Sequence, residues 1–375
     1  MKLLVLTGSL YPLRSNNANL LLKLLPQLTK GCSVSLAAPA GSGEMPETVD
    51  GFPVRWLRDK GGLYRRLVIP AVGKLTDRNG HSDMVQALVL RRALKELLRR
   101  EPFDAVLCSM EPYPSALAAL GLKGVRKFLY LMDPPAITCG GALTPLREKM
   151  LPKILGAQEL VLTTPFIRAA LQERGFRASF REVGFPMIEP HDIPPRKKDD
   201  GKIDLLFCGW LYSDIRSPRY FLDLAKHLDE SFRITFMGKE CDQLRSRFDF
   251  ETKAEVVTLP QQPYEAALQA MADADILINI GNSVPVHMPS KTLEYINARK
   301  PIVNFHKLPD CPTLHYTRRY PLCLDLYEGD PITDKTEEAF LTFCRENSGK
   351  TAPIPELPEC TPEYIAQVIL DGIGE

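Results

Sequence analysis

The chain has 375 residues, of which 45% are hydrophobic and 25% are charged, a balance that excludes a disordered chain and a small disulfide-stabilised domain. The formal net charge of only +1 argues against a nucleic-acid-binding protein. That figure conceals a split, because residues 1–187 hold 26 Lys and Arg against 15 Asp and Glu, whereas residues 188–375 hold 21 against 31. Such a split indicates two units that meet different partners.

Short apolar runs alternate with helical patterns in the first half of the chain. The runs predict strands at 3–7, 33–37, 54–57, 105–108, 128–131, 160–163 and 181–183, and the helical patterns lie at about 18–29, 84–100, 114–120, 144–155 and 165–174. Continuous apolar strands between helices are typical of a parallel sheet that is buried on both faces. The first run is too short for the core of a signal peptide, so we expect a buried strand there.

A stretch rich in proline and charge at 186–202 predicts a linker. The alternation then restarts, with strands predicted at 203–208, 233–237, 254–258, 276–280, 301–304 and 322–324 and helices at about 218–229, 263–272, 290–299 and 334–347. A last helix is predicted to begin at Thr361, with Pro362 at its first position and Gly372 beyond its end.

The predicted fold class is therefore α/β, with two doubly wound Rossmann-like domains that face a central cleft. The expected N-terminal domain is 1–187 and the expected C-terminal domain is 188–360. A terminal helix at 361–375 is expected to pack back toward the N-terminal domain. The loop after the first strand has neither a G-x-G-x-x-G nor a P-loop pattern, so the standard dinucleotide and nucleoside-triphosphate signatures are missing.

The nine cysteines are scattered and form no C-x-x-C pair, which is typical of reduced thiols in a cytoplasmic protein. The six histidines have no metal-ligand spacing with them. No stretch approaches the roughly 18 apolar residues of a membrane-spanning helix.

The most informative segment is 289–303, which reads Pro-Ser-Lys-Thr-Leu-Glu-Tyr-Ile-Asn-Ala-Arg-Lys-Pro-Ile-Val. Pro289 disfavours helix before it and Ser290 is a good N-cap, so a helix is predicted to begin here. Helical spacing places one set of residues on a common arc: Ser290, Lys291, Glu294, Tyr295 and Ala298.

The start of this helix favours an anion, because free N–H groups, the helix dipole and the Lys291 ammonium all attract negative charge. Glu294 lies one turn further and could accept hydrogen bonds from a diol such as ribose. A phosphate site beside a ribose site indicates a nucleotide. The alternative is a capped surface helix with a solvated Lys–Glu pair.

With this segment the chain resembles the GT-B glycosyltransferases over its whole length, and in particular the large retaining family that includes sucrose and mannosyl transferases (family GT4). The most specific match is 273–303. The resemblance implies that the helix start holds the diphosphate of a nucleotide sugar and that Glu294 binds its ribose. The first Glu of the family's E-x7-E pattern falls at Val286, so the chain resembles a variant with P-S-K-x-x-E-Y.

The resemblance also implies a wider donor site. The family's Gly-Arg-Leu after the first strand of the second domain reads Gly209-Trp210-Leu211 here, and Arg216 is the candidate for the missing cation. The remaining donor-site candidates are Gly238 and Lys239 after the next strand, Leu259 at a strand end, Asn282 after the buried strand, and Thr292. Tyr264 could stack on the base or pack within its helix.

In the first domain, the family's His-Asp pair reads Met132-Asp133. Asp133 and Glu111, each on a loop that follows a strand, are the candidate catalytic carboxylates that would order the acceptor hydroxyl; capping or turn roles are the alternative. Asn16 and Asn17 lie in the first loop and are expected on the acceptor side.

Asp273 and Asp275 spell the D-x-D of metal-dependent transferases, but the resemblance places them away from the active site. We therefore expect no metal and no other cofactor, with the helix dipole and basic side chains stabilising the leaving diphosphate.

The helix predicted at 84–100 has a basic face, made of Arg91, Arg92, Lys95 and Arg99. This face could dock on an anionic membrane, as lipid-linked acceptors would require, or could simply be solvated.

The sequence thus predicts a glycosyltransferase that moves a sugar from a UDP- or GDP-linked donor to a glycan or lipid-linked acceptor, retaining and metal-independent. It would serve cell-surface polysaccharide or glycoconjugate synthesis in the cytoplasm, at the inner face of the membrane. Two alternatives remain open: a nucleotide-sugar epimerase of GT-B fold, and a degenerate partner subunit that binds nucleotide or glycan. Val286, Trp210 and Met132 are the departures that favour the second alternative.

Overall fold

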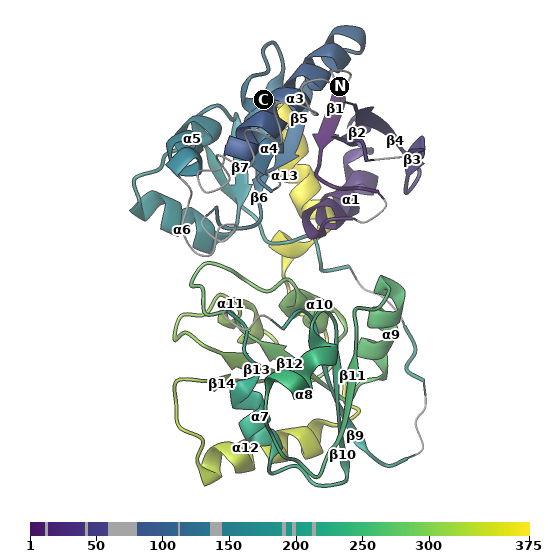
Figure 1. The fold of residues 1–375 in the computed structure, drawn as a ribbon, viewed down its shortest axis with the longest axis vertical. Helices are drawn as coiled ribbons and strands as arrows, with labels where there is room; N and C mark the ends of the chain where they lie inside the picture. Colours follow the sequence, from purple (N-terminus) through teal and green to yellow (C-terminus); the bar gives the residue numbers. More distant parts are fainter. Residues whose placement is uncertain are drawn as a thin grey trace. The chain divides into compact units, whose positions relative to one another are not determined.

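A computed structural model describes residues 1–11, 14–41, 44–58, 81–111, 113–135, 145–189, 193–196, 200–211 and 215–375. Their packing defines two compact units, one formed by Met1–Pro186 with Pro358–Glu375 and the other by Met187–Leu357. Each unit has a parallel sheet between helices (Figure 1), so the predicted α/β class with two doubly wound sheets is confirmed. Among the described residues, no helix is long and apolar enough to cross a membrane.

The N-terminal unit has an eight-stranded sheet in the order β3-β4-β2-β1-β5-β6-β7-β8, parallel except for the β3–β4 pair. Its strands are β1 (Lys2–Leu6), β2 (Ser33–Pro39), β3 (Thr48–Val49), β4 (Phe52–Leu57), β5 (Ala105–Ser109), β6 (Arg126–Leu131), β7 (Leu160–Thr163) and β8 (Phe180–Glu182). Its helices are α1 (Asn16–Leu28), α3 (His81–Arg100), α4 (Tyr113–Leu120), α5 (Pro145–Gly156), α6 (Pro165–Glu173), the 3₁₀ turn η4 (Pro358–Cys360) and α13 (Pro362–Gly374). The strand order switches between β1 and β5, where a doubly wound sheet binds its ligands.

The last helix, α13, is held by Arg126, whose guanidinium donates hydrogen bonds to the carbonyl oxygens of Gly372 (2.9 Å) and Ile373 (2.7 Å). The predicted helix end at Gly372 is wrong, because α13 continues to Gly374. Gly372 serves packing instead: a Cβ there would lie 3.1 Å from the side chain of Leu160 and 3.2 Å from that of Phe128.

The C-terminal unit has a six-stranded, fully parallel sheet in the order β11-β10-β9-β12-β13-β14. Its strands are β9 (Ile203–Cys208), β10 (Phe232–Met237), β11 (Glu255–Leu259), β12 (Ile276–Ile280), β13 (Ile302–His306) and β14 (Cys323–Tyr327). Its helices are α7 (Arg219–Ala225), η3 (Cys241–Gln243), α8 (Leu244–Arg247), α9 (Tyr264–Asp273), α10 (Lys291–Asn297), α11 (Leu314–Thr317) and α12 (Asp334–Asn347). Here the order switches between β9 and β12, so the loops after these strands are the expected ligand-binding loops.

Aromatic rings fill one face of the C-terminal sheet. Phe221 of α7 lies 5.4 Å from Phe305 of β13 and 6.3 Å from Phe340 of α12, measured between ring centroids. Phe236 of β10 lies 5.8 Å from Phe221. All four side chains are at most 1% exposed. Such offset and edge-on pairs bury large apolar area, and they fix α7 and α12 on the same face.

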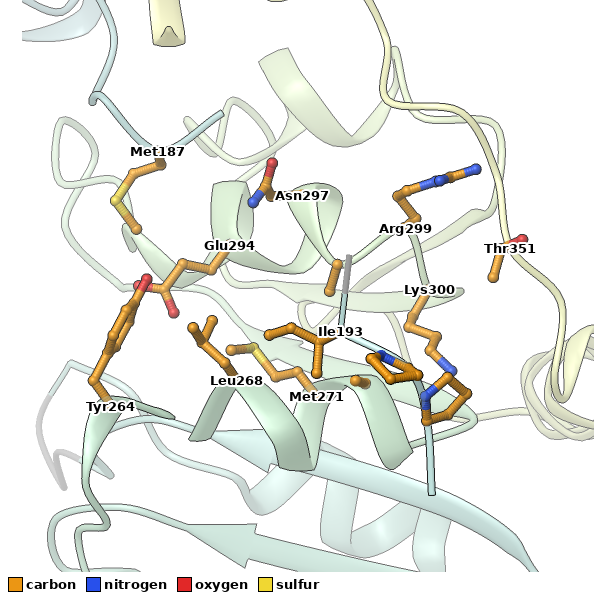
Figure 2. A pocket seen from close by; sticks show the side chains of 14 residues that line it. Met187, Ile193, Tyr264, Leu268, Met271, Glu294, Asn297, Arg299, Lys300 and Thr351 are labelled. Carbon is orange, nitrogen blue, oxygen red and sulfur yellow. The ribbon is translucent and has the colours of Figure 1, made fainter. Parts of the chain in front are cut away.

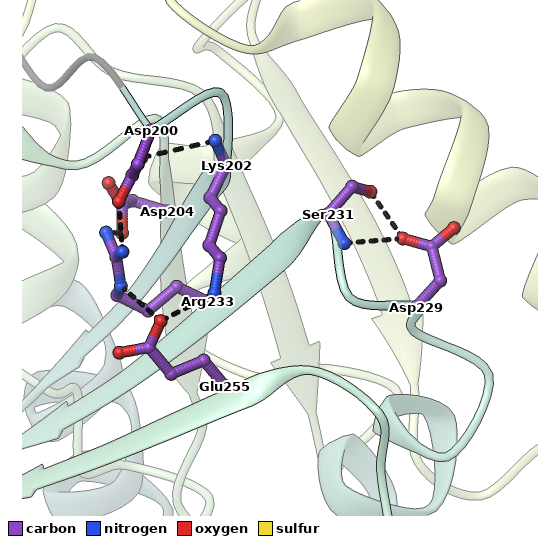
Figure 3. A network of polar contacts seen from close by, with 7 residues as sticks. All are labelled: Asp200, Lys202, Asp204, Asp229, Ser231, Arg233 and Glu255. Carbon is purple, nitrogen blue, oxygen red and sulfur yellow. Dashed lines mark hydrogen bonds and ion pairs between the residues drawn. The ribbon is translucent and has the colours of Figure 1, made fainter.

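An ion-pair network ties the end of the linker to the amino edge of the C-terminal sheet (Figure 3). Arg233, at the start of β10, pairs with Asp200, with Asp204 (3.0 Å) and with Glu255 (3.1 Å). Lys202 also pairs with Glu255, at 2.7 Å. Because the side chains of Asp200 and Glu255 are exposed at the surface, their pairs add little free energy, and the network mainly fixes where the linker ends.

Candidate functional site

Two glycines bring together the loops that follow β9 and β10. The N–H of Gly209 donates to the carbonyl of Met237 (2.9 Å), and the N–H of Gly238 donates to that of Leu259 (3.1 Å). Gly238 has a φ of +138°, and a Cβ on it would lie 1.9 Å from the carbonyl oxygen of Gly209. Only glycine fits there. The predicted donor residues Gly209, Gly238 and Leu259 therefore meet at the carboxyl edge of the sheet.

Trp210 and Lys239 form one unit on this edge. The Lys239 ammonium lies 3.6 Å from the centroid of the Trp210 ring, a cation–π distance. The indole N–H of Trp210 donates to Glu240 (3.1 Å), which also pairs with Arg247. Trp210 thus stands where the resemblance predicts an Arg, and its ring binds the ammonium of Lys239 instead.

Arg216 is a buried cation, 8% exposed, and not the surface arginine that its loop position would also allow. Its Nε donates to Oδ1 of Asn282 (3.0 Å), and its Nη1 donates to the Trp210 carbonyl (3.4 Å). Nδ2 of Asn282 contacts Nδ1 of His287 (2.8 Å) and donates to the His287 carbonyl (3.1 Å). The switch-point loops after β9 and β12 are therefore joined through Arg216 and Asn282.

His287 also belongs to this cluster, although the sequence pattern does not single it out. Because the amide oxygen of Asn282 faces Arg216, its NH₂ group faces the imidazole, so Nδ1 of His287 is assigned as the acceptor and Nε2 as the protonated nitrogen. The available signal was weak, a lone histidine five residues after Asn282 in the same loop.

Ser290 occupies the N-cap position of α10, as predicted, but its side chain does not act as a cap. Ser290 has helical angles (φ −59°, ψ −28°), and its side chain makes no capping hydrogen bond. The turn has already begun, since the N–H of Thr292 donates to the carbonyl of Pro289 and that of Leu293 to Ser290, both at 3.1 Å. A residue inside the turn cannot fold its hydroxyl back as a cap.

Lys291 and Glu294, the two charged residues of α10, form an ion pair with each other. The pair is largely buried, with the Lys291 side chain 24% and the Glu294 side chain 11% exposed. Burial lowers the pKa of the Lys291 ammonium, but Glu294 and neighbouring groups more than offset this, so its pKa lies above the ordinary value. The charged form of Lys291 is therefore favoured, and the buried pair is not the solvated pair of the alternative interpretation.

Other residues of α10 are buried more deeply than the helical spacing predicted. Tyr295, placed by spacing on the arc of Lys291, is 1% exposed. Its hydroxyl accepts from the N–H of Cys208 (2.7 Å) and donates to the Cys208 carbonyl (3.2 Å). Thr292 is fully buried, and its hydroxyl donates to Asn279 of β12 (3.3 Å). The predicted donor residue Thr292 thus lies in the core, and Tyr295 fastens α10 to the end of β9.

A pocket of about 200 Å³ lies within the C-terminal unit, between α9, α10 and the linker (Figure 2). Figure 2 shows Glu294 and Tyr264 facing each other at one end, with Lys300, Arg299 and Thr351 at the other. Its middle is apolar, lined by Ile193, Leu268, Met271 and Ala298. This volume is below the 300–1,000 Å³ of pockets that hold drug-sized ligands, so it could take a part such as a base but not a whole nucleotide sugar.

In the N-terminal unit, the structure brings the predicted acceptor-side residue Asn17 to Asp133. Nδ2 of Asn17 donates to Oδ2 of Asp133 at 3.0 Å, and Asn17 is buried. Ser15 caps α1 by accepting from the N–H of Ala18 (3.3 Å), which fixes where Asn17 lies. Asn16 is exposed one position earlier.

Glu111 follows β5, at the switch point of the same sheet. Its Oε2 accepts from the N–H of Tyr113 (3.2 Å), and its Oε1 lies 3.5 Å from Nη1 of Arg147. The side chain is 18% exposed, and burial raises the pKa of its carboxyl to about 7. Asp133 and Asp83 raise the pKa further, whereas Arg147 and the Tyr113 N–H lower it. The two predicted carboxylates, Glu111 and Asp133, are therefore neighbours that sense each other's charge.

The D-x-D residues take part in backbone hydrogen bonds. Oδ1 of Asp273 accepts from the N–H of Arg196 (2.7 Å), and Oδ2 of Asp275 accepts from the N–H of Asp204 (2.9 Å). Both carboxylates are thus used by the linker and by β9, in agreement with a structural role.

The basic face of α3 is narrower than predicted. Arg91 turns inward, where its guanidinium donates to the carbonyl of Leu117 in α4 (2.8 Å). Arg92, Lys95 and Arg99 remain exposed.

Comparison by sequence finds no matching family model and no matching curated protein. Comparison by structure finds matches over the whole chain. Anabaena HepE, crystallised with UDP and glucose, has a TM-score of 0.62 at 13% identity, with 100% of this chain and 96% of that chain covered. Sucrose-phosphate synthase from Thermosynechococcus elongatus has a TM-score of 0.66 at 10% identity, with 99% and 94% covered. The lipopolysaccharide outer core galactosyltransferase WaaB has a TM-score of 0.63 at 12% identity, with 100% and 99% covered. At such identities the likeness concerns architecture alone, and the chain therefore has the GT-B fold.

Proposed function

We propose that the protein is a glycosyltransferase that moves a sugar from a nucleotide-sugar donor to a glycan or lipid-linked acceptor. The observation that carries this proposal is the carboxyl edge of the C-terminal sheet. There, three cations (Lys239, Arg216 and Lys291) follow the strand ends, and Glu294 opens onto a pocket. Cations for a diphosphate beside a carboxylate for a ribose diol are the recognition groups of a nucleotide.

In this proposal the donor binds by local groups. Lys239 and Arg216 take the diphosphate. Glu294 accepts hydrogen bonds from the ribose and gives up part of its contact with Lys291, which then turns to the phosphate. Tyr264 and the apolar wall of the pocket take the base. A UDP-linked donor is the first candidate, because Anabaena HepE was crystallised with UDP and with UDP-glucose.

The N-terminal unit supplies the acceptor groups. In this proposal Asp133, which accepts a hydrogen bond from Asn17, and Glu111 order the acceptor hydroxyl and take its proton. A carboxyl group whose pKa lies near neutrality suits proton transfer at the pH of a cell. The transfer would need no metal, since the cations of the C-terminal unit stabilise the leaving diphosphate.

The finer features of the proposal come from the sequence resemblance to family GT4. They are retention of the anomeric configuration, a role in cell-surface polysaccharide or glycoconjugate synthesis, and docking on the cytoplasmic face of the membrane through the basic face of α3. The anomeric configuration of the product, read by NMR coupling constants, tests retention directly.

The central experiment is the variant Glu294→Gln, which keeps the shape of the side chain and removes its charge. A hydrogen bond to a charged acceptor contributes about 1.5–3 kcal/mol, so the affinity for UDP should fall roughly tenfold to a hundredfold. Binding is read by thermal shift over a panel of nucleotides, since a ligand at 100 times its dissociation constant stabilises the fold by about 2.7 kcal/mol.

The matched control is Glu265→Gln, at an exposed carboxylate in the first turn of α9. It should leave both nucleotide affinity and sugar transfer unchanged. The donor site is wrongly assigned if Glu294→Gln also leaves both unchanged. Inversion of the donor sugar without any acceptor would replace the proposal by an epimerase. Binding without turnover across the donor panel would replace it by a non-catalytic partner subunit.

A further inference from the structure

Arg147 is a buried cation that nothing in the sequence pattern singled out. It lies on α5, and its side chain is only 10% exposed. Its Nε donates to Oδ2 of Asp83 on α3 (2.8 Å), and its Nη1 lies 3.5 Å from Oε1 of Glu111. The Arg147 guanidinium therefore connects α5, which carries it, with α3 and with the loop after β5 that carries Glu111.

Tyr113 holds Arg147 and Glu111 together. The Arg147 guanidinium lies 4.6 Å from the centroid of the Tyr113 ring, and the Tyr113 hydroxyl donates to the Arg147 carbonyl (3.0 Å). The N–H of the same tyrosine donates to Oε2 of Glu111 (3.2 Å). Stacking, a main-chain bond and an ion pair thus fix the guanidinium in a geometry that a flexible ammonium would not reproduce.

The charges around Glu111 oppose one another. Burial and the carboxylates of Asp133 (on the loop after β6) and Asp83 (on α3) favour the protonated form of Glu111. Arg147 (on α5) and the Tyr113 N–H (on α4) favour the ionised form. An opposite charge within about 4–6 Å typically moves a carboxyl pKa by 1–3 units, so Arg147 offsets part of the rise in the Glu111 pKa that burial causes.

We propose that Arg147 is a positioning residue for the transfer reaction, which keeps Glu111 in place and favours its ionised form so that it can accept the proton of the acceptor hydroxyl, while Asp83 holds Arg147. This rests on the proposed function. In the step itself, the acceptor oxygen forms the bond to the anomeric carbon, and the bond from that carbon to the diphosphate oxygen breaks. The bonding electron pair leaves with the diphosphate, and the proton passes to the Glu111 carboxylate.

The experiment compares Arg147→Met and Arg147→Lys with the wild-type protein. The titration of Glu111 is followed by NMR on protein labelled with ¹³C at Glu side-chain carboxyls, and its signal is assigned by its loss in Glu111→Gln. Arg147→Met should raise the midpoint of the Glu111 titration by about one pH unit or more. Arg147→Lys should give a smaller rise, because an ammonium keeps the charge but cannot span Asp83 and Glu111 together.

Lys149→Met is the matched control, since it removes one positive charge from the exposed side of the same helix. Its midpoint should stay at the wild-type value. In the pH profile of kcat/KM for sugar transfer, the acidic limb should move with the Glu111 midpoint, while the KM for the donor should not change.

An unmoved Glu111 midpoint in folded Arg147→Met overturns the inference. If that variant fails to fold, an unmoved midpoint in Arg147→Lys does so. The two proposals fail separately: a moved midpoint in a protein that transfers no sugar overturns the proposed function, whereas an unmoved midpoint in an active enzyme overturns only the role of Arg147.

Discussion

Burial of the ionised Glu111 carboxyl group lowers the free energy of unfolding of the protein. In the unfolded chain the group titrates near 4.5, whereas burial raises its pKa to about 7 in the native state. Because the native state binds this proton more tightly, the free energy of unfolding falls as the pH rises from the lower value to the higher one. The total loss is about 3 kcal/mol.

Glu111→Gln should remove this loss. We expect the variant to be more stable than the wild-type protein at pH 8 by up to about 3 kcal/mol, and to differ little at pH 4. The stability gain should come with loss of sugar transfer, since active-site groups are commonly kept at the expense of stability. Urea unfolding at several pH values measures the first effect. A stability difference that does not vary between pH 4 and pH 8 would contradict the assignment.

At the same scale, the sequence indicates only part of the site. Glu111 and Asp133 could be predicted because each follows an apolar strand, and in parallel sheets the loops after such strands bind ligands. Arg147 and Asp83 could not, because they lie on helices with no motif, and only the packing of α4 against both α3 and α5 brings them to Glu111. His287 was missed for a similar reason, since its role depends on which way the Asn282 amide points.

At the scale of elements, long apolar strands are easy to predict and short polar helices are not. Every predicted strand is present, with ends shifted by at most three residues. The strand β3 and the helices α8 and α11 were not predicted, because two to four residues are too few to show a period. The start of α10 at Ser290 agrees with the prediction, but helical backbone angles there keep its hydroxyl from capping the helix.

The docking of α10 depends on one hydroxyl. Tyr295→Phe removes both hydrogen bonds to Cys208 and leaves a buried N–H and a buried carbonyl without that partner. We expect the free energy of unfolding to fall by about 2 kcal/mol. Nucleotide affinity should fall as well, since α10 carries Lys291 and Glu294. Urea unfolding and a UDP titration measure the two effects.

Tyr364→Phe is the control for this variant, because that hydroxyl belongs to an exposed tyrosine on α13. It should stay within about 0.5 kcal/mol of the wild-type protein. Equal effects of the two substitutions would show that the contact of α10 with β9 does not contribute specifically to stability or to nucleotide binding.

At the scale of the whole molecule, the near-zero net charge is the sum of a basic N-terminal and an acidic C-terminal half. The acidic half carries the proposed diphosphate site, so binding there depends on Lys239, Arg216 and Lys291 and not on a general positive field. The basic half leaves Arg92, Lys95 and Arg99 exposed on α3.

If α3 docks on a membrane, the whole protein should sediment with anionic vesicles at low salt and be released as salt rises. Replacing Arg92, Lys95 and Arg99 by Gln should weaken binding roughly a hundredfold, at about 1 kcal/mol for each basic residue. The control replaces three exposed basic residues of α5 and its neighbourhood, Lys149, Lys153 and Arg174, and should bind like the wild-type protein. Absent or salt-insensitive sedimentation would contradict membrane docking.

The chain returns at its end to the unit in which it began, and this return makes the stability of the N-terminal unit depend on the last eighteen residues, Pro358–Glu375. On α13, Ile365, Ile369 and Ile373 are at most 4% exposed, and each buried side chain of this size contributes about 1.5–3 kcal/mol. The sum approaches the whole stability of an ordinary domain.

A chain that stops after Leu357 should therefore lose amide-exchange protection throughout β1, β5 and β6, while the strands of the C-terminal unit keep theirs. Ile369→Ala should reproduce part of the effect, at about 2–5 kcal/mol, and the exposed Gln367→Ala should have almost none. Loss of protection in both units at once would mean that they unfold as one cooperative body, and unchanged protection in the N-terminal unit would mean that α13 is dispensable for its fold.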